Sequence, residues 1–113
     1  MAAIYKILPE AMWREAQRAG AFHGSDVDKR DGFIHFSTAG QAIETATKHF
    51  AGQSGLVLLE VEADDLGEAL QWEPSRGGDL FPHLYAPLDV TRVRRAEPLP
   101  LDADGKHVFP RLG

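Results

Sequence analysis

A strand that runs directly into a helix is predicted by the segment Asp31-Gly32-Phe33-Ile34-His35-Phe36-Ser37-Thr38-Ala39-Gly40-Gln41. Side chains alternate between the two faces of a strand, so His35 and Ser37 share one face and their apolar neighbours can enter the core from the other. Thr38 followed three residues later by Gln41 fits the capping box that begins many helices. We therefore expect an imidazole and a hydroxyl to face a polar cleft beside the start of a helix.

Length, charge and composition limit the class of protein. A chain of 113 residues is enough for one hydrophobic core, and we expect a single domain over residues 1–113, with residues 98–113 as a C-terminal tail. The formal net charge of −5 argues against nucleic acid as a partner, because such binding usually needs a basic surface. The chain has no cysteine, which excludes a disulfide framework and a cysteine-based zinc site.

No targeting or membrane segment is predicted. Residues 1–6 lack the apolar region of a signal peptide. No apolar run approaches the length of about 20 residues that a membrane span requires. We expect a cytoplasmic protein without membrane contact.

The first half of the chain alternates between apolar strands and amphipathic helices. Strands are predicted over residues 4–8 and 56–61, the second apolar on both faces and hence central in its sheet. Helical spacing of apolar residues predicts helices over 10–19 and 39–50. Residues 21–30 are predicted to form a polar loop.

The second half is dominated by short extended pieces. Residues 71–73 and 80–85 are predicted to be extended, and Pro82 confines the latter to a sheet edge or an irregular segment. A last strand is predicted over residues 90–96. Two helices in the N-terminal half and several strands indicate an α+β fold.

His35 and Ser37 are the first candidate site. An imidazole and a hydroxyl on one face present donors and acceptors suited to ribose hydroxyls or an amide. Two interpretations stay open: a ligand-binding pair, or a buried histidine bonded to backbone beside a serine that caps the next helix.

Glu73, Ser75 and Arg76 are the second candidate. They surround Pro74 and precede two glycines, and a guanidinium beside glycines suits a phosphate or carboxylate ligand. The alternative is a surface turn with an exposed Glu–Arg pair that contributes little to stability.

His83 and Tyr85 are the third candidate, because they share a face if residues 80–85 are extended. A tyrosine ring can stack on a base or nicotinamide, and a histidine can transfer a proton. The alternative is a half-buried packing tyrosine and a solvated edge histidine. No metal site is predicted, since the histidines are scattered without metal-ligand spacing.

The chain resembles the DUF952 family over nearly its whole length, to about Glu97. The most specific parts of the resemblance are Asp31-Gly32-Phe33-Ile34-His35-Phe36-Ser37 and Phe81-Pro82-His83-Leu84-Tyr85. The family has no established activity. Its fold is similar to that of the ADP-ribosyltransferases, which implies a split, curved mixed sheet that grips NAD.

The resemblance implies an enzyme or binding protein for NAD, acting at the nicotinamide ribose by ADP-ribosyl transfer or hydrolysis. NAD would then be a substrate, with no other cofactor indicated. His35 and Ser37 would hold the ribose–nicotinamide end, Arg76 would meet the pyrophosphate and Tyr85 would stack. Glu73 or His83 would be the catalytic group. The alternative is a non-catalytic module that binds a small ligand or a protein on the same fold.

Overall fold

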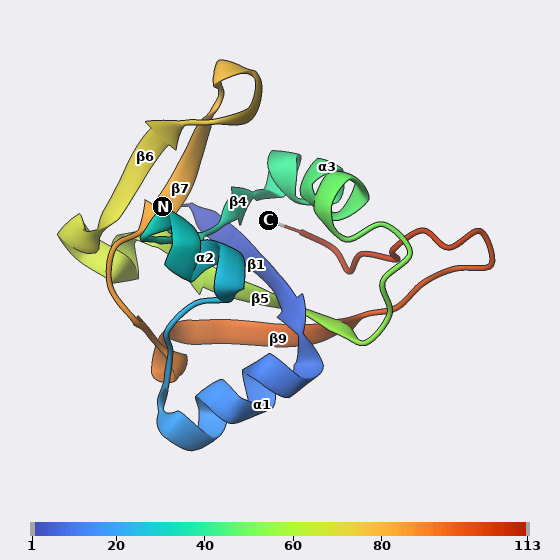
Figure 1. Cartoon of the computed structure of the whole chain (residues 1–113), viewed down its shortest axis with the longest axis horizontal. Coiled ribbons are helices and arrows are strands. Elements are labelled where there is room, and N and C mark those ends of the chain that lie inside the picture. Colours follow the sequence, from blue (N-terminus) through green and yellow to red (C-terminus); the bar gives the residue numbers. More distant parts are fainter. Residues whose placement is uncertain (1, 113) are drawn as a thin grey trace.

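The structure is a computed structural model that describes residues 2–112, and the side chains of these residues with the exception of Arg76. An antiparallel sheet crosses the centre of the molecule in the order β4-β1-β5-β9 (Figure 1). Its strands are β1 (Ala3–Pro9), β4 (Ser37–Thr38), β5 (Leu56–Glu62) and β9 (Val93–Leu99). The predicted central strand is confirmed, because β5 lies between β1 and β9.

Helices cover the two faces of this sheet, as Figure 1 shows: α1 (Glu10–Ala19) and α3 (Ala39–His49). Ile4 and Leu8 of β1 pack in one core cluster with Trp13 of α1, whereas Tyr5 and Ile7 pack in a second cluster with residues of α3. This alternation follows from the two-residue period of a strand. Both predicted helices are confirmed, and the side chain of Gln41 accepts the Thr38 N–H at 3.0 Å at the start of α3.

A second antiparallel sheet carries the other half of the site. Its strand order is β3-β7-β6, with β3 (Ile34–His35), β6 (Leu70–Pro74) and β7 (Leu80–Leu84). A two-stranded pair joins β2 (Ala21–Phe22) to β8 (Leu88–Asp89). Every strand pair among the described residues is antiparallel, so the α+β class is confirmed and the expectation of a mixed sheet is wrong.

The prediction that His35 and Ser37 share one face of a single strand is wrong, because the chain changes sheets at Phe36. Residues 34–35 pair with β7, and residues 37–38 pair with β1. Between them the Phe36 N–H donates to the Pro82 carbonyl at 3.0 Å. His35 and Ser37 therefore belong to two different sheets.

Pro82 lies in the middle strand of its sheet, which corrects the expectation of an edge. The pairing of β3 with β7 covers only residues 83 and 84, so at Pro82 the strand β6 is the one ladder neighbour. A proline is tolerated there because its missing N–H leaves no ladder bond unmade on the β3 side.

A short helix, α2 (Asp26–Asp31), replaces the polar loop predicted over residues 21–30. Ser25 and Asp28 form a reciprocal capping box, in which the Ser25 N–H donates to Asp28 Oδ2 at 2.9 Å and the Asp28 N–H donates to Ser25 Oγ at 3.3 Å. Gly32 ends the helix in the left-handed region at φ 86°. The helix has six residues, too few for a helical period to be visible in the sequence.

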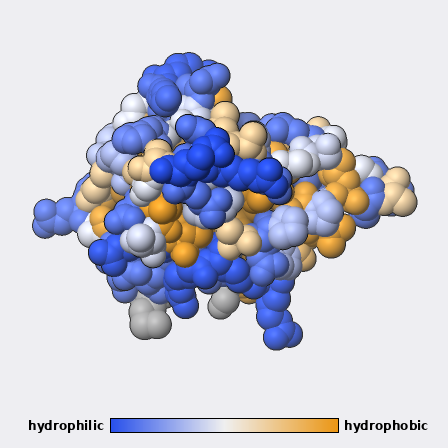
Figure 2. All heavy atoms as spheres, turned by 90° about the horizontal axis from the view of Figure 1, so that it is seen from below, coloured by the Kyte–Doolittle hydropathy of each residue, from blue (hydrophilic) through white to orange (hydrophobic). Residues whose placement is uncertain are grey.

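The rest of the chain is 3-10 turns and the C-terminal tail. The 3-10 turns are η1 (Ala63–Ala69), η2 (Arg76–Gly78) and η3 (Val90–Arg92). The last strand begins later than predicted, because η3 occupies residues 90–92. In the tail, Phe109 and Leu112 pack on the core cluster beneath α3. The face in Figure 2 is largely hydrophilic, with hydrophobic side chains between the polar ones. No helix among the described residues is long and apolar enough to cross a membrane.

Candidate ligand-binding site

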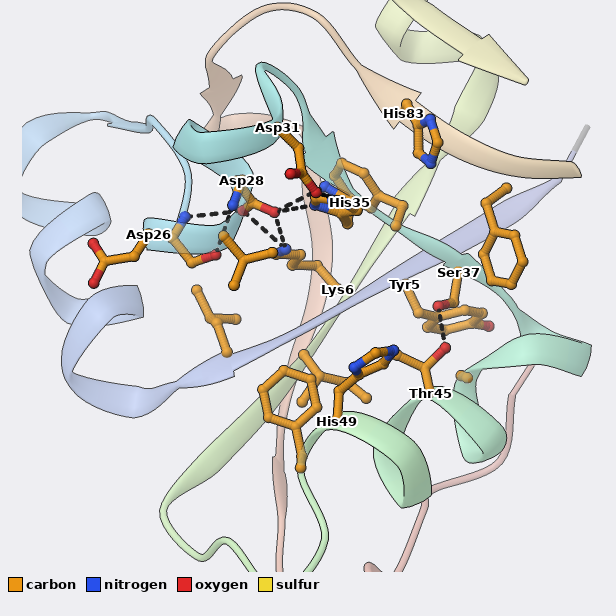
Figure 3. Close-up of a pocket in the computed structure, with 18 of the residues that line it drawn as sticks. Tyr5, Lys6, Asp26, Asp28, Asp31, His35, Ser37, Thr45, His49 and His83 are labelled. Atoms are coloured by element: carbon orange, nitrogen blue, oxygen red, sulfur yellow. Dashed lines mark hydrogen bonds and ion pairs between the residues drawn. The ribbon is translucent and has the colours of Figure 1, made fainter. Parts of the chain in front are cut away.

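A cavity of about 550 Å³ lies among β1, α2, α3 and β7 (Figure 3). His35, Ser37 and His83 line it, together with the previously unassigned Lys6, Asp28, Asp31, Thr45 and His49. Aliphatic and aromatic side chains make up much of the remaining wall. This volume and this mixture of an apolar wall with a few polar groups are typical of a small-molecule site.

A buried ion pair stands at one end of the cavity. Lys6 Nζ lies 3.0 Å from Asp28 Oδ1 and 2.9 Å from Asp28 Oδ2, and the two residues are 7 % and 2 % exposed. Burial lowers the pKa of Lys6, although the neighbouring carboxylate acts in the opposite direction. Each member of the pair compensates a charge that would be costly to bury alone.

Asp28 also holds His35. Asp28 Oδ1 lies 2.6 Å from His35 Nδ1 and accepts the His35 backbone N–H at 3.1 Å. On the other side of the ring, His35 Nε2 lies 2.9 Å from Asp31 Oδ2. A ring that carries both protons can donate to both carboxylates, so Asp28 and Asp31 together fix the plane and position of the imidazole.

The pKa of Asp28 is the net result of opposed effects. Burial acts to raise it, but the hydrogen bond with His35, the charge of Lys6 and the N–H of Ser25 together outweigh burial and hold the pKa far below its ordinary value. Asp28 is therefore a carboxylate at every pH at which the protein is expected to work.

A second polar cluster lies behind His83. Glu73 Oε1 lies 2.8 Å from His83 Nδ1 and accepts the Tyr85 hydroxyl at 2.7 Å. Phe33 stacks on the His83 ring, with a centroid distance of 4.0 Å. The rings of His35 and His83 face each other across β3 and β7 at 5.6 Å. The two imidazoles thus meet at one wall of the cavity, each with a carboxylate on its Nδ1.

Glu73 and Tyr85 shift each other's pKa in opposite directions. The hydrogen bonds from Tyr85 and then from His83 lower the pKa of Glu73. The same contact with Glu73 raises the pKa of Tyr85, because a phenolate would face a carboxylate.

We therefore expect Glu73→Gln to bring the pKa of Tyr85 down toward the ordinary value of about 10. The change is measured by a pH titration of tyrosine absorbance. Glu68→Gln is the matched control, because Glu68 is an exposed acidic residue and the Tyr85 hydroxyl donates to Glu73 instead. An unchanged titration in Glu73→Gln would show that the carboxylate is not the cause of the shift.

The predicted site residues fall into three groups. His35, Ser37 and His83 line the cavity. Glu73 and Tyr85 do not line it but are connected to it through His83. The side chain of Arg76 lies outside the described residues. Tyr85 also lines a second, smaller cavity of about 190 Å³.

The hydroxyl of Ser37 is already engaged. Ser37 Oγ lies 2.9 Å from Thr45 Oγ1, and the Thr45 hydroxyl donates to the Gln41 carbonyl at 3.0 Å. Since Thr45 has a single hydroxyl hydrogen, Ser37 donates to Thr45 and keeps only acceptor capacity for a ligand. Figure 3 shows the pair opposite the Lys6–Asp28 end of the cavity.

Sequence reasoning missed Lys6, Asp28 and Asp31. Lys6 had a signal, since it is the one charged residue in the apolar strand predicted over residues 4–8. Asp28 had another, because Ser25 and Asp28 fit the capping-box spacing. Among the described residues, no group of three or more histidines and carboxylates is arranged to hold a metal ion.

Comparisons with known proteins give a family and a fold. The model described as "Protein of unknown function (DUF952)" matches residues 7–96. The crystal structure of CC0527 from Caulobacter crescentus has 58 % identity, covers 94 % of this chain and 93 % of its own, and gives a TM-score of 0.91. The solution NMR structure of CC0527 has 59 % identity, covers 94 % and 91 %, and gives 0.85. No curated protein matches the chain.

Proposed function

Since this chain belongs to the DUF952 family, which is described by its unknown function, we propose a function from the site itself: binding of NAD or a related nucleotide, with chemistry at the nicotinamide ribose. We also propose that the split between the two sheets at Phe36 corresponds to the split sheet of the ADP-ribosyltransferases. The observation that carries the proposal is the His35 ring, fixed by Asp28 at the wall of a cavity of about 550 Å³ that His83 also lines.

The volume of the cavity and the chemistry of its wall suit a nucleotide. Both ring nitrogens of His35 are held by carboxylates, so its ring is placed to pack against the ribose, and the partly exposed carboxylate of Asp31 beside it is placed to accept hydrogen bonds from the ribose hydroxyls. Arg30 and His49 also line the cavity. Among the described residues of the wall, Arg30 supplies a guanidinium that can bind a pyrophosphate. Arg76 keeps its proposed role at the pyrophosphate.

The proposed reaction breaks the bond between the ribose C1′ and the nicotinamide nitrogen. Nicotinamide leaves as a neutral pyridine with the electron pair of that bond, and the ribose passes through an oxocarbenium-like state. Water or an acceptor hydroxyl then forms a bond to C1′ and gives up a proton. His83, held by Glu73, is the proposed acceptor of that proton.

Asp31 is the carboxylate best placed to stabilise the positive ribose. It lines the cavity and stays partly exposed although it contacts Arg30 and His35, whereas Glu73 does not line the cavity and Asp28 is buried against Lys6. A fixed negative charge beside a developing cation lowers the barrier of the reaction. This proposal puts Asp31 in place of Glu73, which the resemblance offered together with His83 as the catalytic group.

Asp31→Asn is therefore expected to lower the rate of nicotinamide release by roughly 10²–10³-fold, as loss of such a preorganised charge commonly does. NAD binding is expected to persist, because His35 stays bonded to Asp28. Asp26→Asn is the matched control, since Asp26 lines the same cavity from the same helix, whereas the His35 ring contacts Asp28 and Asp31. Equal rates in both variants would remove Asp31 from the mechanism.

The proposed chemistry is tested by incubating the wild-type chain with NAD and measuring the released nicotinamide by chromatography. Formation of nicotinamide and ADP-ribose in equal amounts supports hydrolysis. Saturable binding of NAD without release would instead support the second candidate, a non-catalytic ligand-binding module. That candidate is favoured by one observation, the position of Glu73 behind His83 and away from the cavity wall.

A further inference from the structure

The strand β1 presents its backbone edge to the cavity. Five consecutive residues of this strand, 5–9, line the cavity. Because alternate side chains point to opposite faces of the sheet, one face could supply only every second residue. Contact with all five in sequence means that the cavity meets the strand at its edge.

This edge lacks a neighbouring strand over most of its length. On one side, β5 pairs with all seven residues of β1. On the other, β4 pairs only with Ile4 and Tyr5, because Phe36 turns away to the Pro82 carbonyl. Beside Lys6 and Ile7, the position that a neighbouring strand would occupy is therefore empty. This space continues the line of β4 and is part of the cavity.

The backbone groups of Ile7 on this edge have no partner within the described residues. The Ala63 N–H donates to the Ala2 carbonyl and the Glu10 N–H donates to the Gly55 carbonyl, at the two ends of an unbroken β1–β5 ladder. Alternate residues point to the same side, so Lys6 and Leu8 direct their backbone groups to β5, and Ile7 directs its N–H and C=O into the cavity. No hydrogen bond to these two groups is present among the described residues, and Ile7 is 6 % exposed. Buried backbone groups are nearly always hydrogen-bonded, so water or a ligand must complete this edge.

We propose that the edge of β1 between Lys6 and Leu8 binds an amide group of the ligand. An amide offers one N–H and one C=O, which complement the C=O and N–H of one strand residue. The walls on either side of the edge come from α2 and α3, and they supply Val27, Ala42 and Phe50 as apolar surface for the rest of the ligand.

Two sources supply this chemistry. One is the carboxamide of a nicotinamide ring, and in that case the inference rests on the proposed function and fixes which end of NAD lies at β1. The other is the backbone amide of a short extended peptide, which would add to β1 as a strand. Free nicotinamide and N-acetyl-alanine methylamide separate the two sources, and nicotinate is the matched control because its carboxylate has no N–H.

The test is amide NMR on the full chain, with the chemical shift and hydrogen exchange followed at Ile7; the amides of Lys6 and Leu8, which point to β5, are internal controls. Nicotinamide, NAD or the blocked alanine is expected to shift the Ile7 amide and to slow its exchange at least about tenfold, because a bound amide removes it from water. Nicotinate is expected to leave exchange at Ile7 unchanged. Whichever probe protects the edge identifies the source of the amide.

The outcomes separate this inference from the proposed function. NAD that binds and shifts His35 but leaves the Ile7 amide unprotected would overturn the inference and keep the function. Protection by the blocked alanine without any binding of NAD would keep the inference and overturn the function. Absence of protection by all three amide probes would overturn the inference.

Discussion

Asp28→Ala is expected to lower the free energy of unfolding by about 3–5 kcal/mol, the usual cost of removing one partner of a buried ion pair. The substitution leaves the Lys6 ammonium buried, and it also removes the acceptor of His35 Nδ1. Urea denaturation of the variant and the wild type measures the change. Asp26→Ala is the matched control from the same helix, and an exposed site of this kind is expected to change stability by no more than about 0.5 kcal/mol.

A double variant separates the lost pair from a general effect on α2. Lys6→Met with Asp28→Leu removes both charges together and is expected to recover much of the stability that Asp28→Ala loses. A double variant as unstable as Asp28→Ala would show that the cost comes from the capping box of α2 and not from the unpaired lysine.

The same carboxylate sets an acid limit on stability. The pKa of Asp28 is lower in the folded chain than its ordinary value of about 3.9 in an unfolded one, so the unfolded state takes up a proton first as the pH falls. The contribution of Asp28 is therefore complete above that ordinary pKa and is lost below it, toward the depressed folded pKa. Unfolding at several acidic pH values would show this loss, and it would be absent in the double variant.

His35→Ala is expected to weaken NAD binding by roughly 10–100-fold, because it removes a ring that lines the cavity and holds Asp31 in place. The chain is expected to stay folded, because Asp28 keeps both contacts with Lys6. Titration calorimetry measures the affinity, and His23→Ala is the control, since His23 is exposed and does not line the cavity.

Two results would contradict this role for His35. NAD affinity equal to that of the wild type would show that the ring does not contact the ligand. Equal weakening in His23→Ala would point to a general effect of histidine removal.

Local patterns predicted the elements that depend on local interactions. The helices α1 and α3 follow from the spacing of apolar residues, and the central position of β5 follows from its two apolar faces. The sheet change at Phe36 could not be predicted in this way, because it is decided by pairing with Pro82, which lies 46 residues later. A strand pattern indicates which side chains share a face but not which neighbour each residue pairs with.

The site was also predicted only in part, because tertiary contacts decide which side chains meet. The motif residues His35, Ser37 and His83 do line one cavity, but the groups that hold His35 were not found. Lys6 and Asp28 are 22 residues apart and come from a strand and from a helix too short to predict. Their pairing is a tertiary contact, so neither spacing nor periodicity could show that the carboxylate beneath His35 is balanced by a buried lysine.

Calorimetric titration of the wild-type chain with NAD tests most directly whether this cavity binds a nucleotide. We expect saturable binding with one NAD per chain. No heat of binding up to millimolar NAD, at more than one temperature so that a zero enthalpy is not mistaken for absence of binding, would contradict it.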